Sequence, residues 1–292
     1  MPLSLTKLDN NAWLWLKVNS ESAYDRLAMP FVLPRQKTAL AQAKTYVLFV
    51  GQPRSGHSVV GSVLDAHPNA LISHRLDSLK YLQTGCTLPE VFYLIMKNSQ
   101  RFAKTERKLT AYSYNIDNAW QGQSENLQVI GDQEGKWSAQ RLLANAPRLQ
   151  EQLGKHAIAL RLFNVVRNPF DNIATWSERS GLSIARITHD YFTICDQVQA
   201  IEAHYGSDAL LRVYHERFIA NFDAEFQRIL DFVQLNGSAE LLSACTPLIY
   251  HKPHRSRDNI QWQARDIQAI TKKIQQYDFL HGYDFEQDDF QG

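Results

Sequence analysis

The chain has 292 residues, of which 44% are apolar and 21% charged, values that indicate a globular protein with a buried core. Its formal net charge of +1 argues against a surface that binds nucleic acid or another large polyanion, so any basic site must be local. No stretch approaches the ~20 apolar residues of a membrane span and the first residues do not resemble a secretion signal, so we expect a cytoplasmic protein.

Apolar runs that predict strands alternate along the chain with helical patterns. The clearest strand ends at Gly51 and is followed directly by a helical pattern at 59–66. Nearly continuous apolar runs are typical of strands that are covered on both faces in a parallel sheet. The predicted strands are 45–50, 127–130, 158–166 and 210–214, and the other predicted helices are 89–100, 138–153, 184–204 and 223–235.

This order predicts an α/β fold with a doubly wound, mainly parallel central sheet flanked by helices, in which ligands bind at the carboxyl ends of the strands. No repeat or linker divides the sequence, so we expect a single domain over residues 1–292. Residues 1–44 are expected to form an N-terminal extension packed on it, and 263–292 a C-terminal helix and tail. The polar, basic segment 250–262 is typical of a surface loop.

The first candidate site is the turn GQPRSG at 51–56, which follows the first strand and keeps the glycine spacing of a phosphate-binding loop. His57 and Ser58 stand where a nucleotide-hydrolysing loop has lysine and a hydroxyl residue. Arg54 supplies a cation inside the turn, and the first N–H groups of the next helix would face an anion. An ordinary turn capped by Ser55 or Ser58 explains the same residues.

A second candidate site begins at Arg167, where the third predicted strand ends. Asn168 and Pro169 set a turn at a helix start, and Thr175 lies about two turns into that helix. Arg167 and Thr175 could therefore meet around one anion. In the alternative, Arg167 pairs with Asp171 and Thr175 faces outward.

Together the two motifs resemble the fingerprints of the sulfotransferases that use 3′-phosphoadenosine-5′-phosphosulfate (PAPS). The family's P-[KR]-S-G turn, which holds the 5′-phosphosulfate, is similar to residues 53–56, and its R-N-P-x-D strand end with a later Ser or Thr, which holds the 3′-phosphate, is similar to 167–175. The segment LDAHPN at 64–69 resembles tyrosylprotein and bacterial members. The resemblance covers residues 46–262 and implies a P-loop NTPase-like sulfotransferase fold.

Two more segments are similar to donor-binding parts of this family. Residues 213–216 (VYHE) look like its V-x-Y-E strand end near the adenine, with His215 as an extra residue, and Ser256-Arg257 followed by Trp262 looks like its basic C-terminal loop. The resemblance implies PAPS as co-substrate, 3′,5′-adenosine bisphosphate (PAP) as product, no metal, and a catalytic role for Arg54. The implied donor-binding residues are Pro53, Arg54, Ser55, Gly56, His57, Ser58, Arg167, Thr175, Tyr214, Ser256 and Arg257.

The acceptor needs a general base within hydrogen-bond reach. Counting onward from the His-Pro pair at 67–68, His74 falls where tyrosylprotein sulfotransferases have the first of two glutamates, and Arg75 replaces a residue that is often acidic in relatives. Asp77 could orient the imidazole of His74 or act as the base itself. His57 and Glu134 are further candidates.

A second departure from the family lies after Asp132, where relatives often have a lysine. This chain has Gln133 there, with Lys136 three residues later, so either Lys136 reaches the donor or the site has lost one cation.

The sequence thus predicts an enzyme that moves a sulfuryl group from PAPS to a hydroxyl or amine of a small-molecule or glycan-like acceptor. We expect no nucleic-acid partner, no membrane span, and a monomer or homodimer. Loops in 80–126 and in the C-terminal third are expected to select the acceptor. The alternatives are a P-loop nucleotide kinase or hydrolase with Asp132 as a metal-binding residue, and a non-catalytic nucleotide-binding relative.

Overall fold

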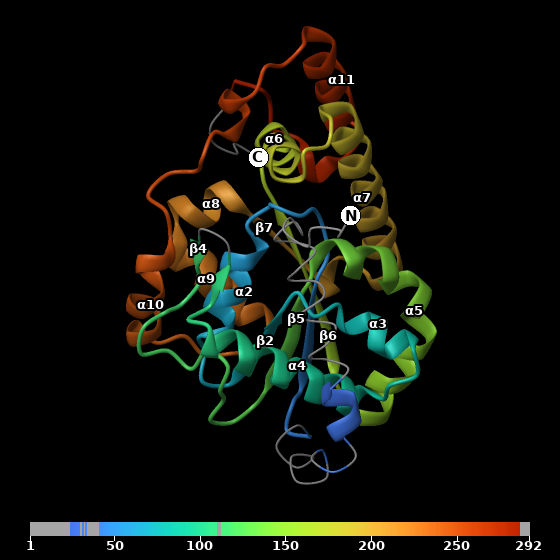
Figure 1. Cartoon of the computed structure of the whole chain (residues 1–292), viewed down its shortest axis with the longest axis vertical. Helices are drawn as coiled ribbons and strands as arrows, with labels where there is room; N and C mark the ends of the chain where they lie inside the picture. The colour runs from blue at the N-terminus through green and yellow to red at the C-terminus, as the bar shows by residue number, and fades with distance from the viewer. Residues whose placement is uncertain (1–23, 30, 32, 34–40, 110–111, 287–292) are drawn as a thin grey trace, which may run out of the picture.

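The computed structural model describes residues 24–29, 31, 33, 41–109 and 112–286 (Figure 1). Its centre is a five-stranded sheet in the order β2-β5-β1-β6-β7, in which every adjacent pair is parallel. The strands are β1 (Thr45–Phe49), β2 (Ala70–His74), β5 (Val129–Gln133), β6 (Ala159–Val166) and β7 (Leu210–Tyr214). Since β1 lies in the middle and later strands are added on both sides of it, its carboxyl end lies where such sheets bind ligands.

Helices cover both faces of the sheet, which confirms the predicted α/β class. Helices α3, α5 and α7 lie on one side, and α2, α8, α9 and α10 on the other (Figure 1). The helices are α2 (His57–Asp65), α3 (Ser78–Gln83), α4 (Leu88–Lys104), α5 (Gly135–His156), α6 (Pro169–Ser180), α7 (Ile184–Tyr205), α8 (His215–Ala220), α9 (Phe222–Phe232), α10 (Ala239–Cys245) and α11 (Ala264–Ile274). A short antiparallel hairpin, β3 (Lys108–Leu109) and β4 (Tyr112–Ser113), follows α4.

The central strand is buried on both faces because its residues alternate between two apolar clusters. Tyr46 and Leu48 belong to the cluster under α3, α4, α5 and α7, whereas Val47 and Phe49 belong to the cluster under α2, α8 and α9. This double burial explains the unbroken apolar run in the sequence. It also fixes the position of the turn that follows β1.

Strand β2 is the element of the sheet that the sequence pattern does not predict. It spans five residues, ALISH, and ends in the polar pair Ser73 and His74, yet all five are buried. It lies at the edge of the sheet, where β5 is its one neighbouring strand among the described residues, and α4 packs against it. A short strand that ends in polar residues lacks the nearly continuous apolar run that predicts β1 and β6.

The two ends of the chain pack on this core as far as the structure describes them. Met29 is buried, and Asp25 forms an ion pair with Arg101 of α4. Near the other end, Ile270 and Ile274 of α11 are buried. Residues 1–23 and 287–292 lie outside the described residues, and the division of the chain into domain, extension and tail stays a prediction.

Among the described residues, no helix combines the length and the hydropathy needed to cross a membrane. The three cysteines, Cys86, Cys195 and Cys245, are all buried free thiols.

Candidate active site

The turn between β1 and α2 leaves the first backbone N–H groups of the helix free for a ligand. Its N-cap residue, Gly56, has φ 100 and provides no side-chain cap, and Arg54 also lies in the left-handed region with φ 67. A Cβ on Gly56 would come within 2.4 Å of His215 Nδ1, so only glycine fits there. Uncapped N–H groups at the positive end of a helix dipole favour an anion.

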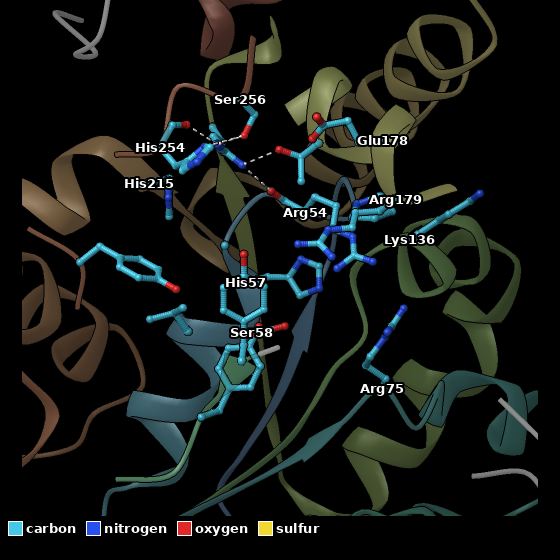
Figure 2. Close-up of a pocket in the computed structure, with 18 of the residues that line it drawn as sticks. Arg54, His57, Ser58, Arg75, Lys136, Glu178, Arg179, His215, His254 and Ser256 are labelled. Carbon is cyan, nitrogen blue, oxygen red and sulfur yellow. Dashed lines mark hydrogen bonds between the residues drawn. The ribbon is translucent and has the colours of Figure 1, made fainter. Parts of the chain in front are cut away.

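A cavity of about 370 Å³ opens over this turn. Figure 2 shows that side chains from several separate segments point into it. They come from the turn, from the ends of β2 and β5, from α6, from the hairpin and from residues 248–259. The lining residues on which the site is built are Pro53, Arg54, Gly56, His57, Ser58, Arg75, Tyr112, Tyr114, Glu134, Lys136, Trp137, Arg167, Thr175, Glu178, Arg179, His215, Tyr250, His254 and Ser256.

Arg167 joins three segments at one edge of the cavity. Its Nη1 donates to Thr175 Oγ1 at 3.2 Å and to the carbonyl oxygen of Arg54 at 3.4 Å. Its Nη2 donates to Ser256 Oγ at 3.1 Å and to the carbonyl oxygen of His254 at 2.5 Å. The structure therefore brings together four residues that the two sequence motifs and the C-terminal loop single out, across 113 residues of chain between Arg54 and Arg167.

The Arg167 side chain is only 7% exposed, and burial lowers its pKa although Asp171 and Glu216 lie nearby. Within the described part of the chain it has no ion pair, and its Nε is a buried donor without a hydrogen-bond partner. A buried guanidinium without a paired carboxylate is costly unless an anion binds beside it.

Asp171 pairs with Arg257 instead of Arg167, so the structural salt bridge considered from the sequence is absent. The Arg257 backbone N–H donates to Asp171 Oδ1 at 2.9 Å, and its Nη1 lies 3.4 Å from Asp171 Oδ2. Arg257 is 1% exposed and does not line the cavity. The predicted surface loop therefore turns inward at Ser256 and Arg257, because the first binds Arg167 and the second binds Asp171.

At the end of β7, His215 faces the cavity and Tyr214 does not. Burial and the neighbouring Arg167 lower the pKa of His215 to about 3, so it is neutral. Glu216 points into the core, where it accepts hydrogen bonds from the Asn168 backbone N–H at 2.9 Å and from Tyr283 Oη at 2.6 Å. Glu216 thereby holds the turn that carries Arg167.

Neither of the two residues favoured as the base from the sequence lines the cavity. His74 is 8% exposed, and its ring stacks on Phe102 of α4 with centroids 4.3 Å apart. Burial and the adjacent Arg75 lower its pKa well below 6.5. Asp77 forms an ion pair with Arg141 of α5, with Nε to Oδ1 at 3.1 Å. The turn after β2 thus directs both side chains to neighbouring helices.

The two further base candidates, His57 and Glu134, do line the cavity. His57 Nδ1 lies 3.2 Å from Ser55 Oγ, and burial together with Arg75 and Arg54 lowers its pKa to about 3. Glu134 follows β5 and is 9% exposed. Burial raises its pKa to about 7, and Arg75, whose Nε lies 3.9 Å from Glu134 Oε2, opposes this shift.

Cations gather on the side of the cavity away from His215, His254 and Ser256 (Figure 2). They are Arg54, Arg75, Lys136 and Arg179, and Arg75 and Arg179 both lower the pKa of Arg54 by repulsion, after burial. Lys136 also lies over the Trp137 ring, 5.5 Å from its centroid. The cation expected directly after Asp132 is thus supplied to the cavity from Lys136, in the first turn of α5.

Asp132 has a structural role at the end of β5. It is fully buried, and its oxygens accept hydrogen bonds from Ser73 Oγ at 2.8 Å and from the Leu76 and Ser78 backbone N–H groups at 3.2 and 2.7 Å. Among the described residues, no three His, Cys, Asp or Glu side chains are grouped to hold a metal. Asp132 does not line the cavity, and the protein donors that its oxygens accept from leave it directed away from the metal-binding role that the kinase or hydrolase alternative assigns to it.

The sequence leaves open which aromatic residues of 80–126 line a pocket and which fill the core, and it does not point to Trp137 or Tyr250. Tyr112, Tyr114, Trp137 and Tyr250 line the cavity as an aromatic wall, and three of them are large exposed rings. Within the expected specificity segment, Phe92 and Tyr93 fill the core instead. In the sequence, Tyr112 and Tyr114 alternate with the polar residues Ser113 and Asn115, whereas Phe92 and Tyr93 lie in an apolar run. This polar setting is the sequence signal that could separate the two cavity tyrosines from core aromatics.

The chain matches no protein-family model and no curated protein sequence. Its fold is similar to that of sulfotransferase STF9 from Mycobacterium avium, with a TM-score of 0.53 and 11% identity over 96% of this chain and 87% of that one. It is also similar to sulfotransferase STF1 from Mycobacterium tuberculosis H37Rv, with a TM-score of 0.51 and 11% identity over 87% and 82%. The predicted resemblance is thus confirmed in the architecture, and this chain has the sulfotransferase fold.

Proposed function

We propose that this protein is a PAPS-dependent sulfotransferase that acts on a hydroxyl or amine of a small-molecule or glycan-like acceptor, by in-line transfer with a general base and no metal. The observation that carries the proposal is the position of Arg167, which is buried and forms no ion pair with a carboxylate among the described residues. Its guanidinium donates to Thr175 and Ser256 in the same cavity as the uncapped start of α2. A donor with two separate anionic groups, a 3′-phosphate and a 5′-phosphosulfate, suits two anion sites of this kind.

Each anion site would hold one end of the donor. Residues 53–58 would bind the phosphosulfate through backbone N–H groups and the Arg54 guanidinium, and Arg54 would stabilise charge on the leaving phosphate. Arg167, Thr175 and Ser256 would bind the 3′-phosphate, for which the unpartnered Arg167 Nε is a ready donor. Tyr214 and Arg257, which do not line the cavity, would act by supporting these residues.

The aromatic wall supports a flat or ring-shaped acceptor. Trp137 is 43% exposed, Tyr112 41% and Tyr250 54%, and all three border the cavity. Exposed aromatic faces bind aromatic rings and the apolar faces of sugars, and their polar atoms can hydrogen-bond to an acceptor hydroxyl.

Calorimetry in EDTA tests the donor assignment. We expect PAP to bind without Mg²⁺, and Arg54→Ala and Arg167→Ala each to weaken it roughly 10- to 100-fold, the cost of removing a charged hydrogen-bond partner. Arg265→Ala, which removes an exposed arginine of α11, is the matched control and should bind PAP like the wild type. Tighter binding of Mg²⁺-ATP than of PAP would contradict the proposal.

The non-catalytic alternative makes a different prediction for the same protein. It expects PAP binding with the same loss in both variants, but no transfer of a labelled sulfuryl group from PAPS to any of a panel of phenols, alcohols, amines and sugars. Transfer to any one of them would exclude it.

A further inference from the structure

Glu134 occupies a fixed position beside the proposed sulfuryl-binding turn. It is the N-cap residue of α5 and has an extended backbone, with φ −120 and ψ 99. The next residue, Gly135, accepts a hydrogen bond from the Gly51 N–H at 3.2 Å, and a Cβ on it would lie 3.0 Å from the Gly51 carbonyl oxygen. This backbone contact ties the end of β5 to the start of the turn, so the distance between the two is set by main chain and not by a mobile loop.

The other imidazole and carboxyl groups at or near the cavity are less suited to accept a proton. His254 is exposed and lies on the side of the cavity away from Arg75 and Lys136 (Figure 2), where its Nδ1 is 3.0 Å from Ser256 Oγ. His57 and His215 are held neutral with pKa values of about 3, which makes each a weak base. Glu178 is exposed on α6 at the cavity mouth. His74 and Asp77 are directed to α4 and α5. Glu134 is the enclosed carboxyl group that faces the cavity among the described residues.

We propose that Glu134 is the general base that takes the acceptor proton, and that Arg75 is a positioning residue that keeps Glu134 ionised; this inference rests on the proposed function. As the acceptor oxygen or nitrogen forms its bond to sulfur, its proton passes to a Glu134 carboxylate oxygen. The bond between sulfur and the 5′-phosphate oxygen breaks, and that oxygen keeps the electron pair. The products are the sulfated acceptor, PAP and a proton that Glu134 releases to solvent.

Several charges set the protonation of Glu134. Arg75, after β2, favours the carboxylate, whereas Asp132 on β5 and Asp77 before α3 disfavour it, as burial does. Arg54, Lys136 and Arg179 add positive charge across the cavity, and the bound donor adds negative charge. Because the base must be deprotonated, activity should rise with pH through about 7. Removing Arg75 should move that rise to higher pH.

Acceptors of different acidity separate a base from a structural residue. With phenol as acceptor, Glu134→Gln should lower kcat by about 10²- to 10⁴-fold, the usual contribution of a general base. With 4-nitrophenol, a stronger acid that supplies its own anion, the loss should be much smaller. PAP should bind Glu134→Gln as it binds the wild type. Glu151→Gln, an exposed glutamate of the same helix, is the control.

The same variants give the results that would overturn the inference. Equal losses for phenol and 4-nitrophenol, activity of Glu134→Gln near the wild-type level, or a larger loss for His74→Ala would each do so. If the wild type binds no PAP, the proposed function fails instead, and the two failures are thus distinct.

A carboxyl NMR titration of PAP-bound protein needs no acceptor. We expect a midpoint for Glu134 at or above about 7, and a higher one in Arg75→Gln. A wild-type midpoint near the ordinary glutamate value of about 4.3, or no change in Arg75→Gln, would contradict the assigned roles.

Discussion

At the scale of one residue, Arg167 is a buried cation without a carboxylate partner in the part of the chain that the structure describes, and this property supports an anion-binding site beside it. Its four polar contacts are two carbonyl oxygens and two hydroxyls, which orient a guanidinium without neutralising it. A structural arginine has the opposite surroundings, as Arg257 does beside Asp171. The spacing of Arg167 and Thr175 in the sequence predicted their meeting, but the lack of a carboxylate partner could be seen only in the folded chain.

Arg167→Lys separates geometry from charge at this position. Lysine keeps the positive charge but loses the planar fork, so it cannot contact Thr175, Ser256 and a phosphate together. We expect PAP affinity to fall roughly 10-fold or more, with little change for adenosine 5′-phosphate, which lacks the 3′-phosphate. Calorimetry with both nucleotides checks this, and equal losses would place Arg167 away from the 3′-phosphate.

Gly56→Ala tests the fit of the turn against His215. The substitution adds strain at φ 100 and a contact of 2.4 Å with His215 Nδ1. We expect a loss of about 1–3 kcal/mol in the free energy of unfolding, measured in urea. His215→Ala in the same chain should restore the part caused by the contact and leave the part caused by φ. A fully additive double variant would show that the two residues do not touch.

At the scale of elements, a buried ion pair connects α2, β2 and α4. Asp65, the last residue of α2, accepts hydrogen bonds from the Ile72 N–H of β2 at 2.5 Å and from Ser99 of α4, and it pairs with the buried Arg107. Because the Asp65 carboxylate contacts β2, α4 and Arg107, it fixes the carboxyl end of α2, the helix that follows the turn at 51–56. This ion pair could not be predicted from the sequence, because Asp65 and Arg107 are 42 residues apart and the LDAHPN motif that contains Asp65 names no partner for it.

Arg107→Met should destabilise this connection strongly. It leaves the Asp65 carboxylate buried and unpaired, for which we expect about 3–5 kcal/mol less stability in urea unfolding. Asp65→Asn together with Arg107→Met should recover part of the loss, because no charge then stays buried. A single-variant loss below about 1 kcal/mol would mean that the pair is not buried in solution.

The elements themselves followed from the sequence to different degrees. The strand predicted at 210–214 coincides with β7, and the predicted third strand differs from β6 by one residue, because both are apolar runs with clear ends. The helix after the turn at 51–56 begins at His57, two residues before the helical pattern at 59–66, and its cap is Gly56 and not Ser55 or Ser58. The sequence favours His74 as the base only through its distance along the chain from the His-Pro pair at 67–68. That distance does not reveal that the His74 ring stacks on Phe102.

At the scale of the whole molecule, the C-terminal segment contacts the residues that flank the proposed donor site. Tyr283 Oη donates to Glu216, the Asn168 side chain donates to the Asp284 carbonyl oxygen at 2.9 Å, and Phe285 packs edge to face on Phe170. Asn168 and Phe170 flank the turn that follows Arg167. Residues more than 100 positions apart thus hold one anion site.

Removal of residues 283–292 should loosen that site. We expect PAP affinity to fall by roughly 10-fold or more, since Arg167 loses the contacts that orient its turn, and the loss of the buried Tyr283 ring should also lower the midpoint of thermal unfolding. Tyr283→Phe, which removes one hydrogen bond and keeps the ring, is the milder comparison. Unchanged PAP affinity in the truncated protein would show that the segment has no part in donor binding.

The proposed enzyme transfers a sulfuryl group from PAPS without a metal, and one transfer measurement is decisive for this proposal. PAPS with a labelled sulfuryl group is incubated in EDTA with a panel of phenols, alcohols, amines and sugars, and the labelled products and PAP are quantified together. We predict that label moves to at least one acceptor in equal amount to the PAP formed, and that Arg54→Ala abolishes the transfer. Failure of every acceptor to take up label, with phosphorylation of one from Mg²⁺-ATP instead, would contradict the claim.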